Sequence, residues 1–357
     1  MRILAVNPGS TSTKISVFEN EEEVWDLKLS HSQEELSPFG PNIFEQYGFR
    51  RDVIVSALEQ AGYPVESFNG IVGRGGLVKP IPGGTYLVDE KLLKDLKSGI
   101  LGQHASNLGG PIAAELAKTA GCDAFIVDPV VVDEMEPVAR FSGNPLITRK
   151  SIFHALNQKA VARKAANELG IQYGESNFIV VHLGGGISVG AHRKGLVVDV
   201  NNALDGDGPF TPERSGGVPA GDLVKLCFSG DYSFDEVKKM IKGQGGIVAY
   251  LGTNDMMKVE NEIMAGNTEW LAVYRAMAYQ IGKEAGAMAA VLNGQVNAIV
   301  VSGGIAYDKQ FVSWLKEMVE FIAPVIVYPG EMEMEALALG ALRVLQGQEK
   351  PRSYNPE

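Results

Sequence analysis

The pattern of apolar and polar residues repeats at two places far apart in the chain. Residues 3–18 form a short apolar run, a Gly/Ser turn and a segment of alternating polarity, which predicts two strands joined by a turn. Residues 178–191 show the same order of parts. An offset of 175 residues places Asn7 on His182 and Gly9 on Gly184. The offset has two possible explanations. Either the chain consists of two related halves, or the similarity is only the general one between any two strand-turn-strand units.

Helical periodicity separates these predicted strands from a third one near residue 298. Helices are expected at residues 151–169, 268–292 and 335–345, with a further helical pattern through residues 311–318. Thr268 is the expected N-cap of the longest helix. Strands that alternate with helices predict an α/β protein. The last residues, 346–357, are expected to form a frayed tail.

Composition limits the classes of partner. The 357 residues suggest about two domains, and 43 acidic against 32 basic residues give a net charge of -11. No nucleic acid or membrane partner is therefore expected, and an anionic ligand needs a local basic pocket. Polar residues interrupt the most apolar stretch, 286–306, so it is not expected to span a membrane. Two cysteines, Cys122 and Cys227, favour a reducing cytoplasm over a disulfide framework.

Several common catalytic motifs are absent or lack their structural context. The chain has no GxxxxGK[ST] phosphate loop and no protein-kinase HRD or DFG motif. Residues 186–190 match GxSxG, but a strand-like segment follows where a hydrolase elbow requires a helix. The five histidines show no zinc-binding spacing.

The two Gly-rich turns remain as candidate anion sites. Ser10, Ser12 and Lys14 alternate after the first strand, so their side chains are expected on one face beside turn amides from Gly9. Hydroxyl groups, amides and an ammonium group together suit phosphate. Residues 184–186 are all glycine and leave backbone N–H groups accessible to phosphate oxygens. Without the second turn, the first is equally well explained as an ordinary hairpin with a polar face.

With these motifs, the chain resembles the acetate and butyrate kinase family over nearly its whole length. The motifs that carry the resemblance stand in family order at residues 7–14 (NPGSTSTK), 73–76 (GRGG), 103–104 (QH), 127–129 (VDP), 151–154 (SIFH), 182–186 (HLGGG), 212–216 (PERSG) and 302–305 (SGGI). The short chain and residues 128–135 (DPVVVDEM) are closer to the butyrate kinases than to the acetate kinases.

The resemblance implies a fold of two ribonuclease-H-like domains, as in actin-like ATPases, around a central cleft. The first domain is expected at residues 1–148 plus 328–357, with the first phosphate loop and the acid site. The second is expected at residues 149–327, with the second phosphate loop and the adenosine site. The resemblance also implies a cytoplasmic homo-oligomer, a dimer or larger.

The implied reaction is ATP plus a short-chain carboxylate giving an acyl phosphate and ADP, reversible toward ATP. Butyrate is the first expected substrate. Isobutyrate, acetate and propionate are alternatives within the class, and a chaperone-like ATPase module is the alternative outside it. Apolar residues at 77–82, next to Arg74, favour an alkyl chain over a sugar.

The resemblance assigns roles to individual residues. The catalytic set is Arg214, His154, Asp128 and Arg74, and the substrate carboxylate is expected at Arg74 and His104. ATP phosphates and adenosine are expected at Asn7, Ser10, Ser12, Lys14, His182, Gly184, Gly185, Gly186, Gly303 and Gly304. Mg²⁺ is expected on Asp128 and on Glu333 or Glu335, because the chain departs from the family pattern there. Asp205 and Asp207 either reach the metal or are solvated loop carboxylates.

Overall fold

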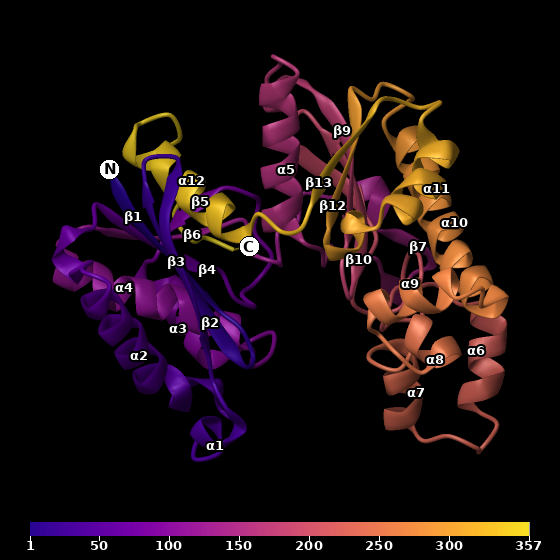
Figure 1. Ribbon diagram of the computed structural model, residues 1–357, viewed down its shortest axis with the longest axis horizontal. Helices are drawn as coiled ribbons and strands as arrows, with labels where there is room; N and C mark the ends of the chain where they lie inside the picture. Colours follow the sequence, from indigo (N-terminus) through magenta and orange to yellow (C-terminus); the bar gives the residue numbers. More distant parts are fainter. Residues whose placement is uncertain (357) are drawn as a thin grey trace. The chain divides into compact units, whose positions relative to one another are not determined.

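The computed structural model describes residues 1–356, which divide into two compact units (Figure 1). Unit 1 comprises Met1–Asp133 and the C-terminal segment from Met332, and unit 2 comprises Glu134–Glu331. In Figure 1, unit 1 has the two ends of the colour bar, indigo and yellow, and unit 2 has the colours between them. In the described residues, no helix combines the length and the apolar character that a membrane span requires.

Unit 1 is built on a six-stranded sheet with the order β3-β2-β1-β4-β6-β5. Strands β1 to β3 are antiparallel neighbours, whereas β4 and β6 run parallel to β1. Its strands are β1 (Arg2–Pro8), β2 (Ser12–Glu19), β3 (Glu22–Ser30), β4 (Gly70–Arg74), β5 (Thr85–Leu87) and β6 (Asp123–Val127). Its helices are α1 (Gln33–Leu36), η1 (Ile43–Gln46), α2 (Tyr47–Gln60), η2 (Val65–Ser67), α3 (Glu90–Ser98), η3 (Ala105–Leu108), α4 (Gly109–Ala120) and α12 (Glu333–Leu345).

Helices cover both faces of this sheet. Side chains alternate between the faces of a strand, so Leu4 and Val6 point to one side, where they pack with residues of α2 and α4. Helix α12 packs on the opposite face, where Leu345 lies against Gly70. Strands β1, β4 and β6 are therefore largely buried on both sides, whereas β3 at the sheet edge is mostly exposed. The ends of β1, β4 and β6 are the positions from which loops can carry polar groups.

Unit 2 is built on a five-stranded sheet with the order β11-β10-β9-β12-β13. Its strands are β9 (Asn177–Leu183), β10 (Ile187–Arg193), β11 (Leu196–Val200), β12 (Ala298–Gly303) and β13 (Val325–Pro329), with a separate hairpin of β7 (Phe141–Asn144) and β8 (Ile147–Thr148). Its helices are η4 (Pro137–Arg140), α5 (Ala155–Glu168), η5 (Tyr173–Glu175), α6 (Ala220–Cys227), α7 (Phe234–Ile241), α8 (Ile247–Leu251), α9 (Met256–Met264), α10 (Thr268–Val291), η6 (Gly304–Tyr307) and α11 (Lys309–Val319).

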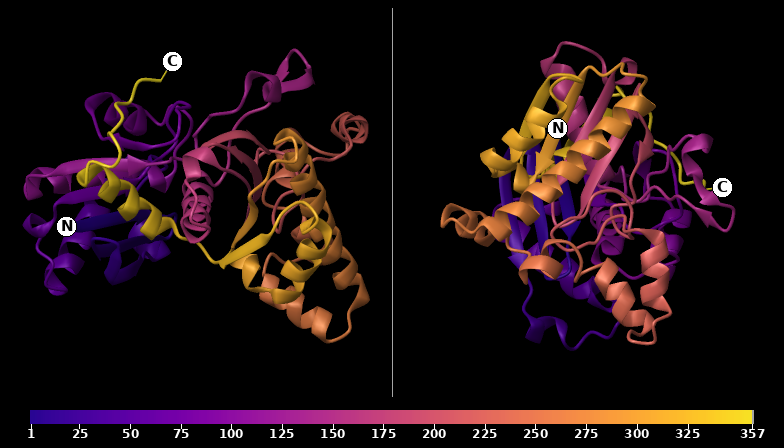
Figure 2. Two further views of the ribbon diagram at one scale, coloured as in Figure 1. Left: turned by 90° about the horizontal axis from the view of Figure 1, so that it is seen from above. Right: turned by 90° about the vertical axis from the view of Figure 1, so that its right-hand side faces the viewer.

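The two sheets share one topology. In each, three antiparallel strands are followed by two strands parallel to the first, so β9, β10, β11, β12 and β13 correspond to β1, β2, β3, β4 and β6. The first strand spans residues 2–8 in unit 1 and 177–183 in unit 2, and the second strand begins at Ser12 and Ile187. The repeat at an offset of 175 residues is thus a repeat of structure. Figure 2 shows the strands of the first copy in indigo and violet and those of the second copy in pink and gold.

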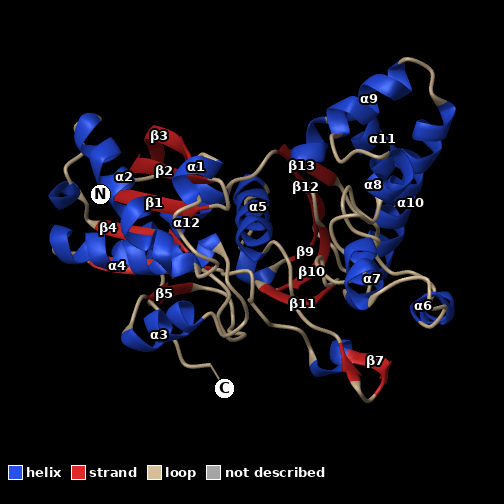
Figure 3. Ribbon diagram, turned by 90° about the horizontal axis from the view of Figure 1, so that it is seen from below, coloured by secondary structure: helices blue, strands red, loops and turns tan. Residues whose placement is uncertain are grey.

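The helix that follows the last parallel strand of each unit packs on the sheet of the other unit. Helix α5 comes after β6 but packs on β9 and β12, and α12 comes after β13 but packs on β1 and β4 (Figure 3). The division therefore falls at 133/134 and 331/332 rather than at 148/149 and 327/328. Residues 134–148 are hydrogen bonded within unit 2, where the Glu136 amide donates to the Val198 carbonyl.

Three local expectations were wrong. Asn267, rather than Thr268, is the N-cap of α10, and its side-chain oxygen accepts from the Trp270 amide. Residues 151–154 precede the helix instead of opening it, because α5 begins at Ala155. The C-terminal tail is not frayed over its described residues. The Arg352 amide donates to the Thr85 carbonyl, and the Tyr354 hydroxyl donates to Asp95 at 2.7 Å. Tyr354 is buried in an apolar cluster with Tyr86 and Leu96, so one aromatic ring anchors the tail.

Gly73 provides a test of the packing in unit 1. A Cβ atom at Gly73 would lie 2.1 Å from the carbonyl oxygen of Gly109 at the start of α4. Gly73→Ala is therefore expected to lower the free energy of unfolding by about 3 kcal/mol, because the backbone of α4 must move. Urea unfolding followed by circular dichroism measures this change.

Gly48→Ala is the matched control in the same unit. Gly48 lies inside α2 and a Cβ atom there meets nothing within 4 Å, so this variant is expected to be more stable by about 0.5–1 kcal/mol. Equal stability of the two variants would contradict the close approach of α4 to β4.

Candidate functional site

The loop between β1 and β2 carries the first group of predicted phosphate ligands. Ser12 and Lys14 lie on one face of β2, and Lys14 is exposed, as the alternation predicted. Thr13 points to the other face and is fully buried. The Gly9 amide, which was expected to face a ligand, instead donates to the Ser12 carbonyl at 2.7 Å. The amides of Ser10 and Thr11 donate to no residue among positions 1–356.

Beneath this loop lies Arg50, a residue of α2 with no exposed surface. Its guanidinium donates to the carbonyl oxygens of Gly9, Ser10 and Ser12 at 2.8–3.1 Å. It also donates to the hydroxyl group of Thr13 and to the side-chain oxygen of Gln46. Sequence reasoning missed Arg50. The sequence does contain an indication of its burial. Arg50 precedes Ile54 and Leu58 by four and eight residues, so all three lie on the buried face of α2.

Arg74, Asn7 and Glu333 come together in unit 1. Arg74 ends β4, Asn7 is the penultimate residue of β1, and Glu333 is the first residue of α12. Arg74 Nη1 forms an ion pair with Glu333 Oε2, and Asn7 Nδ2 donates to the same oxygen at 2.8 Å. The Arg74 side chain forms no other polar contact with residues 1–356, so two of its guanidinium nitrogens keep their donors for a ligand.

Asp128 lies at the end of β6 in a strained backbone conformation. Its φ angle is +36°, which is uncommon for a residue with a side chain and is typical of functional sites. The carboxylate is buried, and Oδ1 accepts from the Gly84 amide at 2.7 Å. Asp128 itself donates through its amide to the Gly84 carbonyl. This reciprocal pair holds the carboxylate in place at a strand end.

His104 has a local structural partner. It is the N-cap of η3, and its Nδ1 atom accepts from the Ser106 amide at 3.2 Å. Because Nδ1 accepts, the neutral ring carries its proton on Nε2. The exposed side chain can therefore present an N–H donor, and its expected contact with the acid stays a prediction.

The predicted metal ligands do not form a dense cluster. No group of three or more His, Cys, Asp or Glu side chains in the described part of the chain is arranged to hold a metal. Asp205 pairs with Lys238, and Asp207 accepts from the amides of Asn202 and Gly208. Asp207 thus has partners in its own loop, whereas the partner of Asp205 comes from α7.

The second Gly-rich turn joins β9 to β10 in unit 2 and lies against Arg214. A Cβ atom at Gly186 would lie 1.7 Å from Arg214 Nη1, so only glycine leaves room for the guanidinium. Arg214 also donates to the carbonyl of Ala203. The hydroxyl group of Thr211 donates to the Gly185 carbonyl at 2.7 Å and accepts from the Arg214 amide. Thr211, which sequence reasoning missed, therefore ties the turn to the Arg214 segment.

Burial lowers the pKa of the Arg214 guanidinium, and Glu213 acts in the opposite direction. A partly desolvated cation interacts strongly with any anion placed beside it, because less water screens the charge. The turn and Arg214 together form an anion site whose walls are backbone and guanidinium.

The predicted catalytic residue His154 and the predicted phosphate ligand His182 stack on each other at this turn. The rings of His154 and His182 have centroids 3.8 Å apart with an interplanar angle of 16°. Asn157 Nδ2 donates to His182 Nδ1 and to the Ser302 hydroxyl, each at 2.8 Å. An amide nitrogen only donates, so Nδ1 of His182 accepts and the ring proton lies on Nε2.

His154 is held on its other side by a serine. Its Nδ1 atom is 2.9 Å from the Ser188 hydroxyl, which also accepts from Gln158 Nε2. Ser188, the serine of the GxSxG match, therefore orients a histidine within a buried polar network. The network involves Asn157 and Gln158, which sequence reasoning did not identify, and Ser188, which it considered only as a hydrolase nucleophile.

Gly303 and Gly304 close β12 at the predicted adenosine site. Gly303 has a φ of +96°, and a Cβ atom there would lie 2.3 Å from the Leu183 carbonyl oxygen. A Cβ atom at Gly304 would meet nothing within 4 Å. The backbone of Gly304 is thus open to a ligand, whereas Gly303 is required by the fold.

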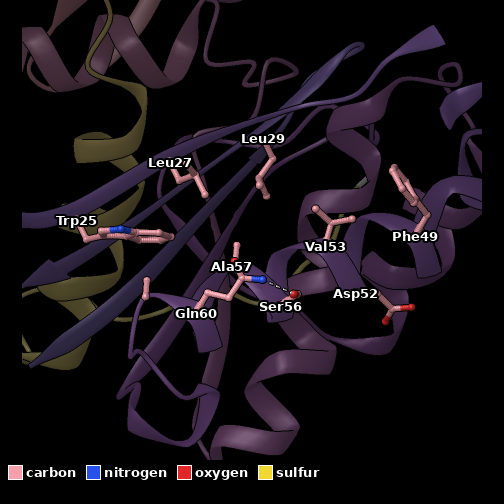
Figure 4. A pocket seen from close by; sticks show the side chains of 10 residues that line it. Trp25, Leu27, Leu29, Phe49, Asp52, Val53, Ser56, Ala57 and Gln60 are labelled. Carbon is pink, nitrogen blue, oxygen red and sulfur yellow. Dashed lines mark hydrogen bonds between the residues drawn. The ribbon is translucent and has the colours of Figure 1, made fainter. Parts of the chain in front are cut away.

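A separate groove in unit 1 has a volume of about 670 Å³ and lies between β3 and α2 (Figure 4). Trp25, Leu27 and Leu29 of β3 face residues of α2 such as Val53 and Ala57. None of the predicted site residues lines it. The groove is mainly apolar and lacks the cations that a phosphate site requires.

Comparison with known proteins gives a consistent result. The profile of the Acetokinase family matches residues 138–322. The chain is 56% identical to butyrate kinase 2 of Clostridium acetobutylicum over 353 residues, which cover 99% of each protein. The fold is similar to that of a crystallised acetate kinase from Porphyromonas gingivalis, with a TM-score of 0.79, 18% identity and coverage of 96% and 99%. It is also similar to a propionate kinase from Francisella tularensis, with a TM-score of 0.74, 17% identity and coverage of 95% and 98%.

Proposed function

The chain belongs to the acetokinase family, and we propose that it transfers the γ-phosphoryl group of ATP to the carboxylate of butyrate, giving butanoyl phosphate and ADP. The identity of 56% over the whole length with a butyrate kinase supports the four-carbon acid. The observation that supports a carboxylate as the phosphoryl acceptor is the arrangement of Arg74. Its guanidinium pairs with Glu333 and keeps further donors for a second anion.

Arg74 binds the acid in this proposal. A guanidinium presents donors in a planar fork that matches two carboxylate oxygens. One nitrogen, Nη1, is engaged by Glu333, so the ion pair fixes the plane of the group while the others meet the substrate. The neighbouring residues Val78 and Ile81 are buried and apolar, which supports an alkyl chain rather than a polyol beside the carboxylate.

Mg²⁺ is assigned to Asp128 and Glu333. The donor set fits, because Mg²⁺ prefers oxygen ligands and keeps several waters, so one or two carboxylates suffice. Glu335 is two residues farther along α12, about 200° around the helix axis, and therefore points away from the Asn7 and Arg74 side. When bound with ATP, Mg²⁺ would neutralise charge on the phosphates.

The groups in unit 2 stabilise the transferred phosphoryl group. Phosphoryl transfer has a loose transition state whose equatorial oxygens need positioned cations and donors. Arg214 supplies the cation, and His182 and the stacked His154 are the proposed hydrogen-bond donors. Nδ1 of His182 accepts from Asn157, so its proton lies on Nε2, which faces Glu331 Oε1 at 3.7 Å. Gly184, Gly185 and Gly186 contact the phosphates, and Gly304 allows the adenosine to approach.

The proposal is tested by trapping the acyl phosphate as a hydroxamate. Magnesium-ATP is supplied with straight and branched acids of two to five carbons, and product is measured for each. The largest kcat/KM is expected for a four-carbon acid, because one methylene in a pocket is worth about 1–3 kcal/mol.

The competing functions give different results in the same assay. A maximum at acetate or propionate would reassign the substrate within the family, and isobutyrate above butyrate would indicate a branched-chain enzyme. ATP binding without any acid-dependent ADP release would contradict the kinase and favour a chaperone-like ATPase module. The homo-oligomeric state and the cytoplasmic location stay predictions.

A further inference from the structure

We propose that Arg50 is a positioning residue of the first phosphate loop, which it holds from beneath in the conformation that binds phosphate and to which it supplies an uncompensated positive charge. This inference rests on the proposed function in that it takes the phosphate to be that of ATP. It concerns a residue to which neither the sequence motifs nor the family resemblance assigned a role.

The first observation is the direction of the loop carbonyls. Gly9 and Ser10 both direct their carbonyl oxygens at the Arg50 guanidinium, and Thr11 directs its own at the His31 amide. In a trans peptide, the C=O group and the next N–H group point in opposite directions. The amides of Ser10 and Thr11 therefore point away from Arg50, and they donate to nothing within residues 1–356. Arg50 thus creates an outward-facing pair of amide donors.

The second observation is the chemistry of the acceptors. Every acceptor of Arg50 in the described residues is neutral: carbonyl oxygens, the Thr13 hydroxyl and the Gln46 amide oxygen. Buried arginines are usually paired with a carboxylate. Here the hydrogen bonds are satisfied without cancelling the charge, so the guanidinium raises the potential of the loop above it.

Neighbouring titratable groups leave this charge in place. His31 Nε2 lies 2.9 Å from the Thr13 hydroxyl, which accepts from Arg50 and so donates to the histidine. Burial, and then the charge of Arg50, lowers the pKa of His31, so that ring is neutral at pH 7. Burial lowers the pKa of Arg50 itself only to about 10, so the guanidinium stays protonated.

Two substitutions separate the charge from the hydrogen bonds. Arg50→Gln removes the charge and most donors, whereas Arg50→Lys keeps the charge with fewer donors. Arg51→Gln is the matched control, because Arg51 is the next residue of α2 but pairs with Asp52 and Glu115 on the surface. The full chain is used, and ATP affinity is measured directly by calorimetry as well as from KM.

Arg50→Gln is expected to raise the Kd for ATP about tenfold or more and to leave the KM for the acid within about twofold, because the loop contacts only the phosphates. Arg50→Lys is expected to fall between this variant and the wild type, and Arg51→Gln to match the wild type. In the absence of ATP, hydrogen exchange should be faster in both Arg50 variants at the Gly9 amide, which donates to the Ser12 carbonyl, and at the His31 amide, which donates to the Thr11 carbonyl.

An unchanged Kd for ATP in Arg50→Gln would overturn the proposal, as would an equal rise in the KM values of ATP and acid. Should Arg50→Gln not fold, Thr13→Val decides, because it removes one acceptor of Arg50 at nearly constant volume. It is expected to raise the Kd for ATP about threefold, and an unchanged Kd there would also overturn the proposal. Since ATP binding is measured without acid, these outcomes are independent of whether butyrate is the substrate.

Discussion

Replacing Arg214 with alanine is expected to lower kcat about 10³-fold while the KM values for ATP and for the acid change by no more than about threefold. The reason is that the interaction of the guanidinium with the phosphoryl oxygens strengthens as charge is redistributed in the transition state. Steady-state hydroxamate formation at several concentrations of both substrates separates kcat from KM.

The position of Arg214 makes this prediction specific. The guanidinium occupies the space that a side chain at Gly186 would fill, so the cation is in direct contact with the Gly-rich turn. Gly186→Ala should therefore reduce kcat in the same direction as Arg214→Ala, by displacing the side chain rather than removing it. An unchanged kcat in Arg214→Ala would refute the catalytic role.

Arg275→Ala serves as the control for the loss of one positive charge from unit 2. Arg275 is exposed on α10, where its guanidinium lies 5.6 Å from the centre of the Trp314 ring. Kinetic constants close to those of the wild type are expected for this variant. A loss of kcat similar to that of Arg214→Ala would indicate that net charge, rather than the position of Arg214, controls the rate.

The α/β architecture and the repeat could be predicted from the sequence because both depend on local patterns. Strand-turn-strand units at residues 3–18 and 178–191 are visible as alternation around glycine, and the structure confirms both. The resemblance to the acetate and butyrate kinase family is confirmed as well. Such motifs can be recognised in the sequence because the backbone conformation of a strand or a tight turn restricts which residues can occupy it.

Other features depend on contacts between distant residues, which no local pattern encodes. The exchange of α5 and α12 between the units moved the division of the chain to 133/134, since a helix joins the sheet on which it packs. Tyr354 anchors the tail through its buried ring. In the sequence it is a single aromatic residue among polar ones, which does not indicate burial. For α12 and for Tyr354 the decisive apolar partners are far away in the sequence.

The supporting groups of the site show the same limit. Arg50 lies 37 residues from Thr13, and Asn157 lies 25 residues from His182 and 145 from Ser302. The motifs indicated which side chains and turns face a ligand, but not which groups hold them. A buried arginine or asparagine in an otherwise ordinary helix becomes informative only when its acceptors are known.

Replacing Arg74 with alanine is expected to raise the KM for the acid about 100-fold, with a smaller rise in the KM for ATP. The guanidinium is half-buried, and its unengaged donors are the proposed partners of the substrate carboxylate. Removing it also frees Glu333, whose Oε2 atom then keeps only Asn7 of these two donors. Because that carboxylate is a proposed Mg²⁺ ligand, some loss of ATP affinity should accompany the loss of acid binding.

The comparison with Arg74→Lys separates geometry from charge. Lysine keeps the positive charge but cannot hold Glu333 and two carboxylate oxygens in one plane, so its KM for the acid should stay at least about tenfold above the wild type. Arg2→Ala, which removes an exposed arginine paired with Glu19 in the same unit, should leave both KM values unchanged. If Arg74→Ala kept the wild-type KM for the acid, Arg74 would be a structural partner of Glu333 alone, and the carboxylate would have to bind elsewhere.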